Sequence, residues 1–370
     1  MLKKRSIFLY PLSFLYGLVI EIRNFLFNAK IFKSVEFKIP VICVGNISAG
    51  GTGKTPHTEY LAELLREKFK VAVLSRGYKR KSSGFILADE TKTVNDIGDE
   101  PWQISRKFPD ITVAVDSNRM RGVQKILELK PETGVIILDD GYQHRKLTPG
   151  FSILLTDYNR LMTKDHLLPY GNLREPVHNS HRADIIIITK SPETISPMQK
   201  RIFKKEIRKA PFQNLYFTSI KYFNPVPVFD NIANIPVRYN PEKKLDCGIV
   251  LVTGIANPYP LLDFIKAGFR ETDHLQFEDH HSFTSDDIEK ITGALKKLKS
   301  TSKFVFTTEK DAVRLRGFTN IAEPLRSLLY YIPVGIDFPN NDKEEFNNLI
   351  INYVRKNKRN NRVSERKRHY

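Results

Sequence analysis

The chain has 370 residues, enough for two domains with separate cores, and its 41% hydrophobic and 27% charged residues are typical of a globular protein. Its two cysteines, Cys43 and Cys247, provide neither a disulfide framework nor the ligand spacing of a metal site, which suits a reducing compartment. The net charge of +18 is unevenly placed, because residues 355–370 hold eight Lys or Arg against one acid and so contribute +7.

This basic tail, residues 355–370, is predicted to be disordered and solvated. Two functional interpretations remain beside that one. The tail is attracted either to anionic lipid headgroups or to nucleic acid, and composition does not separate the two.

The N-terminal segment, residues 1–33, has the pattern of an amphipathic helix in a membrane interface. Its uncharged run, Ser6 to Ile20, has 15 residues, short of the roughly 20 that cross a bilayer, and no signal-peptide cleavage site follows. Polar or small residues recur every three or four positions and form one narrow stripe: Ser13, Gly17, Glu21, Asn24 and Asn28. A helix buried in the protein's own core or in a dimer contact is the alternative.

Residues 41–56 combine a buried-type strand, a glycine-rich turn and the start of a helix. In that context Gly-Lys-Thr forms a phosphate cradle, in which Lys54 adds a charge and the Thr55 hydroxyl holds magnesium. A strict P-loop has glycine where this chain has Ser48, but Gly50 and Gly51 keep the turn flexible. The alternative is a glycine turn that only joins a strand to a helix.

Two acidic segments follow the loop along the chain. Residues 135–140 form an apolar strand that ends in Asp139 and Asp140, where P-loop proteins keep a magnesium-directed carboxylate. The edge of a parallel sheet brings this strand end beside the phosphate loop. Asp99 and Glu100 precede a predicted helix, and the plain interpretation there is an N-cap with a dipole-favouring acid.

Further along, the sequence favours ATP over GTP. Residues 189–192 occupy the place of a guanine-reading motif, but the aspartate of that motif is absent.

Arg174 lies on a proline- and glycine-marked loop, where a phosphate or sugar contact competes with an ordinary surface position. His280 and His281 beside Asp279 are candidates for metal ligands, a surface turn or a general base, although no third ligand stands at a regular spacing.

Alternating strands and helices predict an α/β fold with a P-loop NTPase-type doubly wound sheet and a second, smaller α/β domain. The predicted divisions are the membrane-interface helix 1–33, a P-loop domain 34–215, an extended linker 216–228, the smaller domain 229–354 and the tail 355–370.

Together these segments resemble the tetraacyldisaccharide 4'-kinase family, the lipid A pathway kinases of Gram-negative bacteria. The resemblance is carried, in family order, by the motifs at residues 45–56, 75–78, 98–101, 138–144, 168–175, 277–280 and 308–311. It spans residues 41 to about 315. The N-terminal helix matches only in character, and the basic tail lies outside the resemblance.

The resemblance implies transfer of the ATP γ-phosphate to the 4'-hydroxyl of a lipid-linked disaccharide 1-phosphate, with Mg²⁺ as cofactor. It also implies peripheral attachment to the cytoplasmic face of the inner membrane. The chain is expected to act as a monomer, without nucleic acid as a partner. The competing hypothesis is a P-loop GTPase or metallochaperone-type switch protein, which lacks its guanine-reading motif and metal-delivering cysteines here. A nucleic-acid-binding protein is suggested only by the net charge.

The resemblance also implies roles for individual residues. Asp99 and His280 would prepare the sugar hydroxyl, with Lys54, Asp139 and Asp140 at the reacting centre. Metal contacts would come from Thr55, Glu100 and Asp139. Weaker assignments toward the substrate or the phosphates are Arg76, Tyr78, His144 and Arg174. The ATP-binding loop would comprise Ser48, Ala49, Gly50, Gly51, Thr52, Gly53, Lys54 and Thr55.

Overall fold

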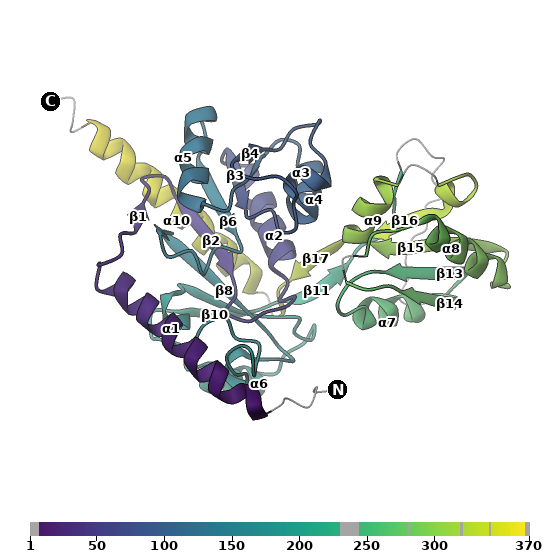
Figure 1. Cartoon of the computed structure of the whole chain (residues 1–370), viewed down its shortest axis with the longest axis horizontal. Helices are drawn as coiled ribbons and strands as arrows, with labels where there is room; N and C mark the ends of the chain where they lie inside the picture. The colour runs from purple at the N-terminus through teal and green to yellow at the C-terminus, as the bar shows by residue number, and fades with distance from the viewer. Residues whose placement is uncertain (1–6, 230–243, 280, 319–320, 340–341, 367–370) are drawn as a thin grey trace. The chain divides into compact units, whose positions relative to one another are not determined.

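The computed structural model describes residues 7–229, 244–279, 281–318, 321–339 and 342–366, with side chains through residue 357 in the last helix. Contacts divide the chain into unit 1, Met1–Ile220 with Ile336–Tyr370, and unit 2, Lys221–Gly335 (Figure 1). The division differs from the sequence prediction, because residues 336–354 belong with the P-loop unit instead of the smaller one.

Unit 1 is built on a sheet that has eight strands among the described residues, all parallel except its edge strand β4. In spatial order the strands are β10 (Asn214–Phe217), β9 (Ile185–Thr189), β8 (Phe151–Asp157), β2 (Val41–Gly45), β6 (Val135–Asp139), β3 (Val71–Ser75), β5 (Thr112–Val115) and β4 (Ile86–Leu87). The central strands are buried along their whole length, as strands covered on both faces must be.

Helices cover both faces of this sheet, which confirms the doubly wound fold. One core contains apolar residues of α2 (Lys54–Arg66), α4 (Asp99–Lys107) and α10 (Asp342–Arg366), and the other those of α5 (Arg119–Leu129) and α6 (Pro197–Ile207). Shorter elements of unit 1 are η1 (Ile7–Leu9), α3 (Val94–Ile97), η2 (Met162–Lys164), η3 (Val177–Arg182) and the paired strands β1 (Val35–Glu36) and β7 (Leu147–Thr148).

Helix α10 explains why the last part of the chain returns to unit 1. Phe346, Ile350 and Val354 repeat at helical spacing and are buried in the core that also contains Leu61 of α2. The helix then continues to Arg366, where the sequence predicts disorder from residue 355 onward. The buried turns supply the costly helix nucleus, so the basic residues that follow only extend it.

Helix α1 (Tyr10–Asn28) turns its narrow polar stripe toward the protein. Ser13, Gly17 and Asn24 are buried, whereas most of its large apolar side chains are exposed; Phe14 is 73% accessible. This reverses the usual arrangement of a surface helix. Of the described helices, only the segment Ile7–Asn28 is long and apolar enough to cross a membrane by length and composition.

Unit 2 has a five-stranded sheet in its described part, parallel except for β12. The order is β12 (Val226–Pro227), β16 (Leu329–Ile332), β15 (Ser302–Thr308), β13 (Leu245–Thr253) and β14 (Phe269–Gln276). Helices α8 (Ser285–Lys297) and α9 (Glu309–Arg316) contribute to one core, and α7 (Tyr259–Gly268) to the other. The remaining elements are η4 (Leu325–Leu328) and the pair β11 (Ser219–Tyr222) and β17 (Val334–Asp337), which carry the chain between the units.

Candidate nucleotide and phosphoryl-transfer site

The glycine loop of unit 1 has the backbone of a phosphate cradle. It joins the buried strand β2 to helix α2, whose first residue is Lys54. Gly50 and Gly53 have φ of 103° and 84°, the left-handed region that glycine adopts without strain. The N-terminal end of α2, with its unpaired N–H groups and positive dipole end, therefore opens on the loop.

Polar contacts fix the inside of this loop. The Asn46 side chain donates to the Thr52 hydroxyl at 2.8 Å, and its Oδ1 lies 3.5 Å from the Lys54 ammonium. The Thr189 hydroxyl, at the end of β9, donates to the Thr52 carbonyl at 2.9 Å. The Gly-Lys-Thr segment is thus held in one shape by side chains from neighbouring strand ends.

Two cations hold the outer side of the loop. Arg160 donates to the Ala49 carbonyl at 2.8 Å, and Lys190 donates to the Gly51 carbonyl at 2.5 Å. Lys190 also forms an ion pair with Asp157 at 2.7 Å. Neither Arg160 nor Asp157 was predicted from the sequence, where residues 189–192 indicate only that a guanine-reading motif is absent.

The loop at residues 168–175 braces the phosphate loop from another side. Its Arg174 N–H donates to the Ile47 carbonyl at 2.7 Å, and its Asn172 carbonyl accepts from the Ala49 N–H at 2.6 Å. Gly171 is required here, because a Cβ atom would lie 1.9 Å from the His166 carbonyl oxygen. The predicted loop therefore shapes the nucleotide site as well as presenting Arg174.

Asp139 ends strand β6 and is buried beside the loop. Its two oxygens accept from the hydroxyls of Thr58, at 3.1 Å, and Ser75, at 3.2 Å. Burial, followed by the charges of Glu100 and Asp140, raises the pKa of Asp139 to about 6. The negative charges of Glu100 and Asp140 therefore act on Asp139, and a bound cation would offset this repulsion, although the three side chains do not form one metal-ligand group among the described residues.

Asp140 lies between two cations. Its Oδ1 is 3.7 Å from the Lys54 ammonium and its Oδ2 is 3.5 Å from the Arg174 guanidinium. The residue adopts a φ of 50°, which directs its side chain differently from that of Asp139. Oδ1 is buried and makes no hydrogen bond, so it is an acceptor available to a ligand.

Asp99 and Glu100 are the first two residues of helix α4, after Gly98 with a φ of 90°. Asp99 is buried and its Oδ1 accepts from the Glu100 N–H at 3.0 Å. Their place in the first turn agrees with the dipole-favouring interpretation. The effect of Glu100 on the pKa of Asp139 places it near the β6 acids as well, so the two interpretations are compatible.

Sequence reasoning missed two buried basic residues of the site. Arg119 donates to the Asp139 carbonyl at 3.1 Å, and burial lowers its pKa to about 10. His57 lies between the Gly53 carbonyl, at 2.7 Å, and the Thr218 hydroxyl, at 3.0 Å, and burial lowers its pKa to about 4. His57 is thus a neutral support of the loop. No local pattern distinguishes either residue from an ordinary helix residue.

The weaker substrate assignments lie in the same unit. Arg76 and Tyr78 line a hollow of about 370 Å³, and Tyr78 is 60% exposed. Burial, reinforced by Arg119 and Arg76, lowers the pKa of His144 to about 4, so this imidazole is neutral at pH 7. Of these assigned residues, Arg174 contacts the acids at the end of β6, since its guanidinium lies 3.5 Å from Asp140.

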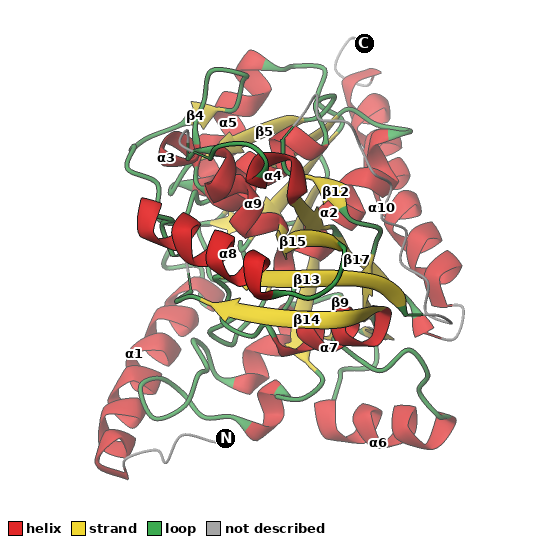
Figure 2. Ribbon diagram, turned by 90° about the vertical axis from the view of Figure 1, so that its right-hand side faces the viewer, coloured by secondary structure: helices red, strands yellow, loops and turns green. Residues whose placement is uncertain are grey.

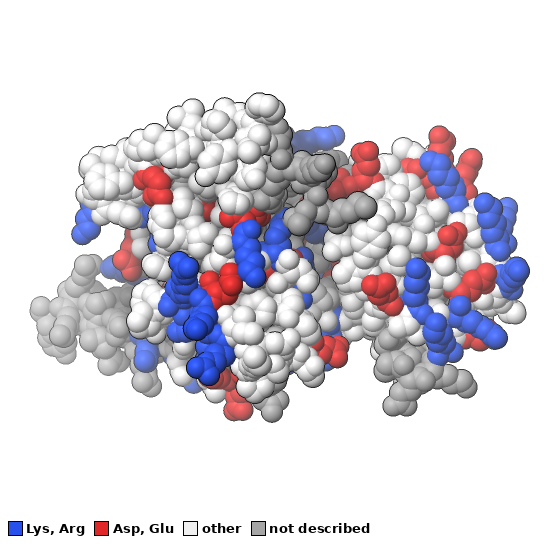
Figure 3. All heavy atoms as spheres, turned by 90° about the horizontal axis from the view of Figure 1, so that it is seen from below, with Lys and Arg blue, Asp and Glu red and all other residues white. Residues whose placement is uncertain are grey.

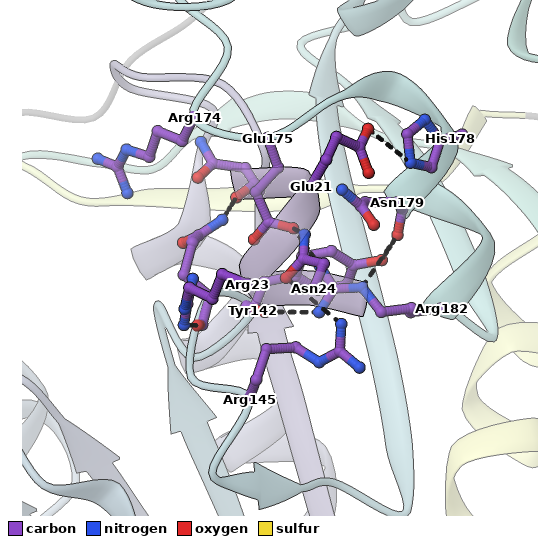
Figure 4. Close-up of polar contacts among 12 residues, drawn as sticks. Glu21, Arg23, Asn24, Tyr142, Arg145, Arg174, Glu175, His178, Asn179 and Arg182 are labelled. Atoms are coloured by element: carbon purple, nitrogen blue, oxygen red, sulfur yellow. Dashed lines mark hydrogen bonds and ion pairs between the residues drawn. The ribbon is translucent and has the colours of Figure 1, made fainter. Parts of the chain in front are cut away.

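Helix α1 is connected to this site by hydrogen bonds (Figure 4). Arg23 of α1 donates to the Gln143 carbonyl at 2.8 Å, and the Gln143 side chain donates to the Asn46 carbonyl at 2.7 Å. Asn24 of α1 donates to Glu175 at 3.4 Å, and Arg182 pairs with the same buried carboxylate at 2.5 Å. The polar stripe of α1 therefore docks on the loops that frame the phosphate loop.

The predicted histidine pair belongs to unit 2, and His280 lies outside the described residues. His281 lies 2.8 Å from Asp287 and stacks on Phe277 with ring centroids 4.7 Å apart. Although burial acts to raise the pKa of Asp287, hydrogen bonds from His281 and Thr284 hold it below its usual range. Because Asp287 belongs to the capping box of α8, His281 has a structural partner. No group of three or more potential metal ligands was found among the described residues of either unit.

A strand, a left-handed glycine loop and a helix that begins with Lys-Thr, facing acids at the end of the adjacent strand, define a P-loop nucleotide-binding protein. The comparisons narrow this class. A family model described as Tetraacyldisaccharide-1-P 4'-kinase matches residues 5–355. The chain belongs to this family and is a kinase, which confirms the resemblance seen in the sequence.

Individual relatives agree over nearly the whole chain. A tetraacyldisaccharide 4'-kinase of Bacteroides thetaiotaomicron is 48% identical over 97% of this chain and 96% of its own length. One of Flavobacterium johnsoniae is 43% identical over 94% of this chain and 97% of its own length. The crystal structure of LpxK from Aquifex aeolicus in complex with ATP has a TM-score of 0.71 and 26% identity, covering 94% of this chain and 98% of that one.

Proposed function

We propose that this chain transfers the γ-phosphate of ATP to the 4'-hydroxyl of tetraacyldisaccharide 1-phosphate in lipid A biosynthesis. The observation that carries the proposal is the approach of Lys54 on the phosphate loop to Asp140 at the end of β6, at 3.7 Å. The family match supports the acceptor, and the ATP complex of the A. aeolicus relative supports the donor. The comparisons give no support to the GTPase or metallochaperone alternative.

In this proposal residues 48–55 hold the triphosphate, and the Lys54 ammonium neutralises charge that develops on the transferred group. Thr55, Glu100 and Asp139 are the residues that would hold Mg²⁺. The raised pKa of Asp139 and the unbonded Asp140 oxygen fit a divalent cation, and Mg²⁺ takes one or two protein carboxylates with the rest from phosphates and water. The cation would supply charge stabilisation at the phosphates.

Asp99 and His280 are proposed to prepare the sugar hydroxyl. A carboxylate orients an imidazole and raises its basicity, which suits removal of a proton from an alcohol late in the transfer. The structural attachment of His281 to Asp287 supports His280 as the reactive member of the pair. Arg76, Tyr78, His144 and Arg174 are proposed to contact the substrate or the phosphates.

The exposed apolar face of α1 supports peripheral attachment to the cytoplasmic face of the inner membrane, where ATP is present and an acylated acceptor resides. The chain is proposed to act there as a monomer, because all described phosphate-loop and acid residues come from one unit of one chain.

The direct test is to incubate the purified chain with ATP, Mg²⁺ and vesicles that contain the lipid disaccharide monophosphate. We expect a product heavier by one phosphate, detected by mass spectrometry. Lys54→Ala is expected to lower the rate at least about 100-fold without a change in melting temperature. A wild-type chain that adds no phosphate, or a fully active Lys54→Ala chain, overturns the proposal.

A second experiment separates the two histidines. His280→Ala is expected to slow transfer about 100-fold or more with little effect on ATP affinity. His281→Ala, the matched control, is expected to lower the stability of unit 2 because Asp287 loses a bonded partner. The assignment fails if His280→Ala retains its turnover and His281→Ala loses it while remaining folded.

A further inference from the structure

Helix α6 is strongly basic and has no role in the site described above. Residues 197–210 contain six Lys or Arg and one acid. A capping box at Ser196 satisfies backbone N–H groups at its N-terminus. Such a concentration of charge exceeds what solubility requires and indicates an anionic partner.

Some of these charges are engaged within unit 1. Lys200 pairs with Asp342 at 2.9 Å, and Lys209 donates to the Gln213 carbonyl at 2.7 Å. Glu206, the acid of the segment, accepts from Thr163 at 3.3 Å. The four other cations are exposed and form no ion pair with the described residues: Arg201, Lys204, Lys205 and Arg208.

Apolar side chains accompany these cations on the exposed surface. Met198 is 74% and Ile202 53% exposed, and they stand four positions apart on one helix face. Unpaired cations beside exposed aliphatic side chains are the pattern of a helix that lies on an anionic bilayer. A polynucleotide offers no apolar phase for Met198 and Ile202, so the pattern favours lipid.

A groove extends this surface toward α1. It has a volume of about 740 Å³, and its lining includes Val177 and His178 of η3 with Ile202 and Lys205 of α6. His178 in turn lies 3.1 Å from Glu21 of α1. Helix α1 therefore contacts η3, and η3 lines the same groove as α6.

The views of the molecule agree with this continuity. Figures 1 and 2 place α1 and α6 at the same end of unit 1. Figure 3, seen from that end, shows a broad surface of unit 1 without charged side chains and, across from it, a gathering of Lys and Arg. One face of the unit thus combines an uncharged zone and a cationic zone.

We propose that α6 and the groove beside η3 form a second membrane contact, which binds the phosphate-bearing headgroups of anionic phospholipids. The proposal rests on the proposed function in taking α1 as the helix that lies in the bilayer. Arg201, Lys204, Lys205 and Arg208 face the headgroups, and Met198 and Ile202 enter the interface. Two separated contacts fix the orientation of unit 1 on the membrane, which a single helix does not.

The test measures binding of the full chain to vesicles of phosphatidylcholine alone and with 30% phosphatidylglycerol, a mixture chosen at roughly the anionic content of a charged membrane. Wild type is expected to bind the anionic vesicles more tightly. Each cation near such a surface contributes about fivefold, so the double variant Lys204→Gln, Lys205→Gln is expected to lose about 25-fold on anionic vesicles and nothing on neutral ones. Arg355→Gln, Lys356→Gln on α10 is the matched control of equal charge, expected to lose little.

Each outcome has a distinct meaning. Phe14→Asp on α1 is expected to weaken binding to both kinds of vesicle, and kinase activity on detergent-dispersed acceptor is expected to survive in the α6 variant. Equal binding of wild type to neutral and anionic vesicles, or an equal loss in the α10 control, overturns the α6 contact alone. Failure of wild type to bind any vesicle overturns the membrane part of the proposed function. Competition by duplex DNA at equal phosphate concentration, with no vesicle preference, overturns the choice of lipid.

Discussion

Asp139 is a buried carboxylate whose charge works against folding when no cation is present. Its pKa of about 6 lies above the roughly 3.9 of an unfolded aspartate, so the folded chain binds this proton more tightly. The associated stability is complete below about pH 4 and is lost as the pH rises through 6.

We therefore expect Asp139→Asn to have a higher free energy of unfolding than wild type. The difference between variant and wild type is expected to be larger by about 1–2 kcal/mol at pH 7.5 than at pH 5. The amide oxygen keeps an acceptor for one of the Thr58 and Ser75 hydroxyls, and the amide NH2 group is able to donate to the other, without the charge. Urea unfolding at both pH values, without Mg²⁺ or nucleotide, measures the difference. Asp110→Asn, at an exposed ion pair with Arg66, is the control, and an equal pH effect there contradicts the explanation.

Gly171 gives a second prediction at this scale. Gly171→Ala is expected to destabilise unit 1 by about 3 kcal/mol and weaken ATP binding, because the new Cβ meets the His166 backbone and displaces the brace on Ala49. Gly293→Ala in α8 has open space and is expected to stabilise by about 0.5–1 kcal/mol. Thermal unfolding and ATP titration test both, and the account fails if the two variants behave alike.

The positions of Lys54 and Asp139 were predictable because short local patterns determine them: a glycine loop after a strand, and an acid at the end of another strand. Arg119 and His57 were not. Each is an ordinary helix residue in sequence, and only the tertiary fold surrounds it with Asp139 or with Gly53 and Thr218.

At the scale of elements, α1 shows that the spacing of polar residues along a helix identifies its polar and apolar faces but does not indicate which face is buried. The stripe at Ser13, Gly17 and Asn24 was predicted, but its burial depends on polar partners elsewhere in the chain. The strand predicted at residues 135–140 agrees with β6 within one residue, since apolar β-branched runs are local signals. The short elements β4 and α3 have no counterpart among the predicted elements, because neither is long enough to show a periodicity.

The reversed faces of α1 predict opposite results for two substitutions. Asn24→Leu is expected to destabilise unit 1 by about 1–3 kcal/mol, because the buried Glu175 loses a donor. Phe14→Ser is expected to leave stability unchanged and to weaken vesicle binding about tenfold or more, because an exposed ring no longer enters the bilayer. Urea unfolding and vesicle sedimentation distinguish them. A destabilising Phe14→Ser would show that this face is covered by protein.

For the whole molecule, α10 was the main element that the sequence assigned to the other unit. Its apolar residues recur at a spacing that fits any core. Nothing local in the sequence indicates that the helix packs in the core of unit 1, beside Leu61 of α2, instead of in unit 2, whose strands precede it in the chain. The described helix also includes most of the basic segment predicted as a disordered tail.

Truncation tests this assignment. A chain that ends at residue 357 is expected to keep its melting temperature and kinase activity. A chain that ends at residue 341 is expected to lose unit 1, since burial of Phe346, Ile350 and Val354 each contributes about 2 kcal/mol. Circular dichroism melting and ATP binding report the result, and a stable, ATP-binding chain without α10 contradicts it.

The interrupted layout of unit 1 also has a consequence for biosynthesis. The ribosome makes all of Lys221–Gly335 after the eight strands and before α10. Unit 2 is continuous and is able to fold as it emerges, whereas the part of the larger core that α10 covers stays exposed until translation is almost finished. A chaperone that binds the nascent chain is expected to bind this apolar surface. A ribosome stalled between residues 220 and 336 leaves a chain in which the surface remains exposed and prone to aggregation.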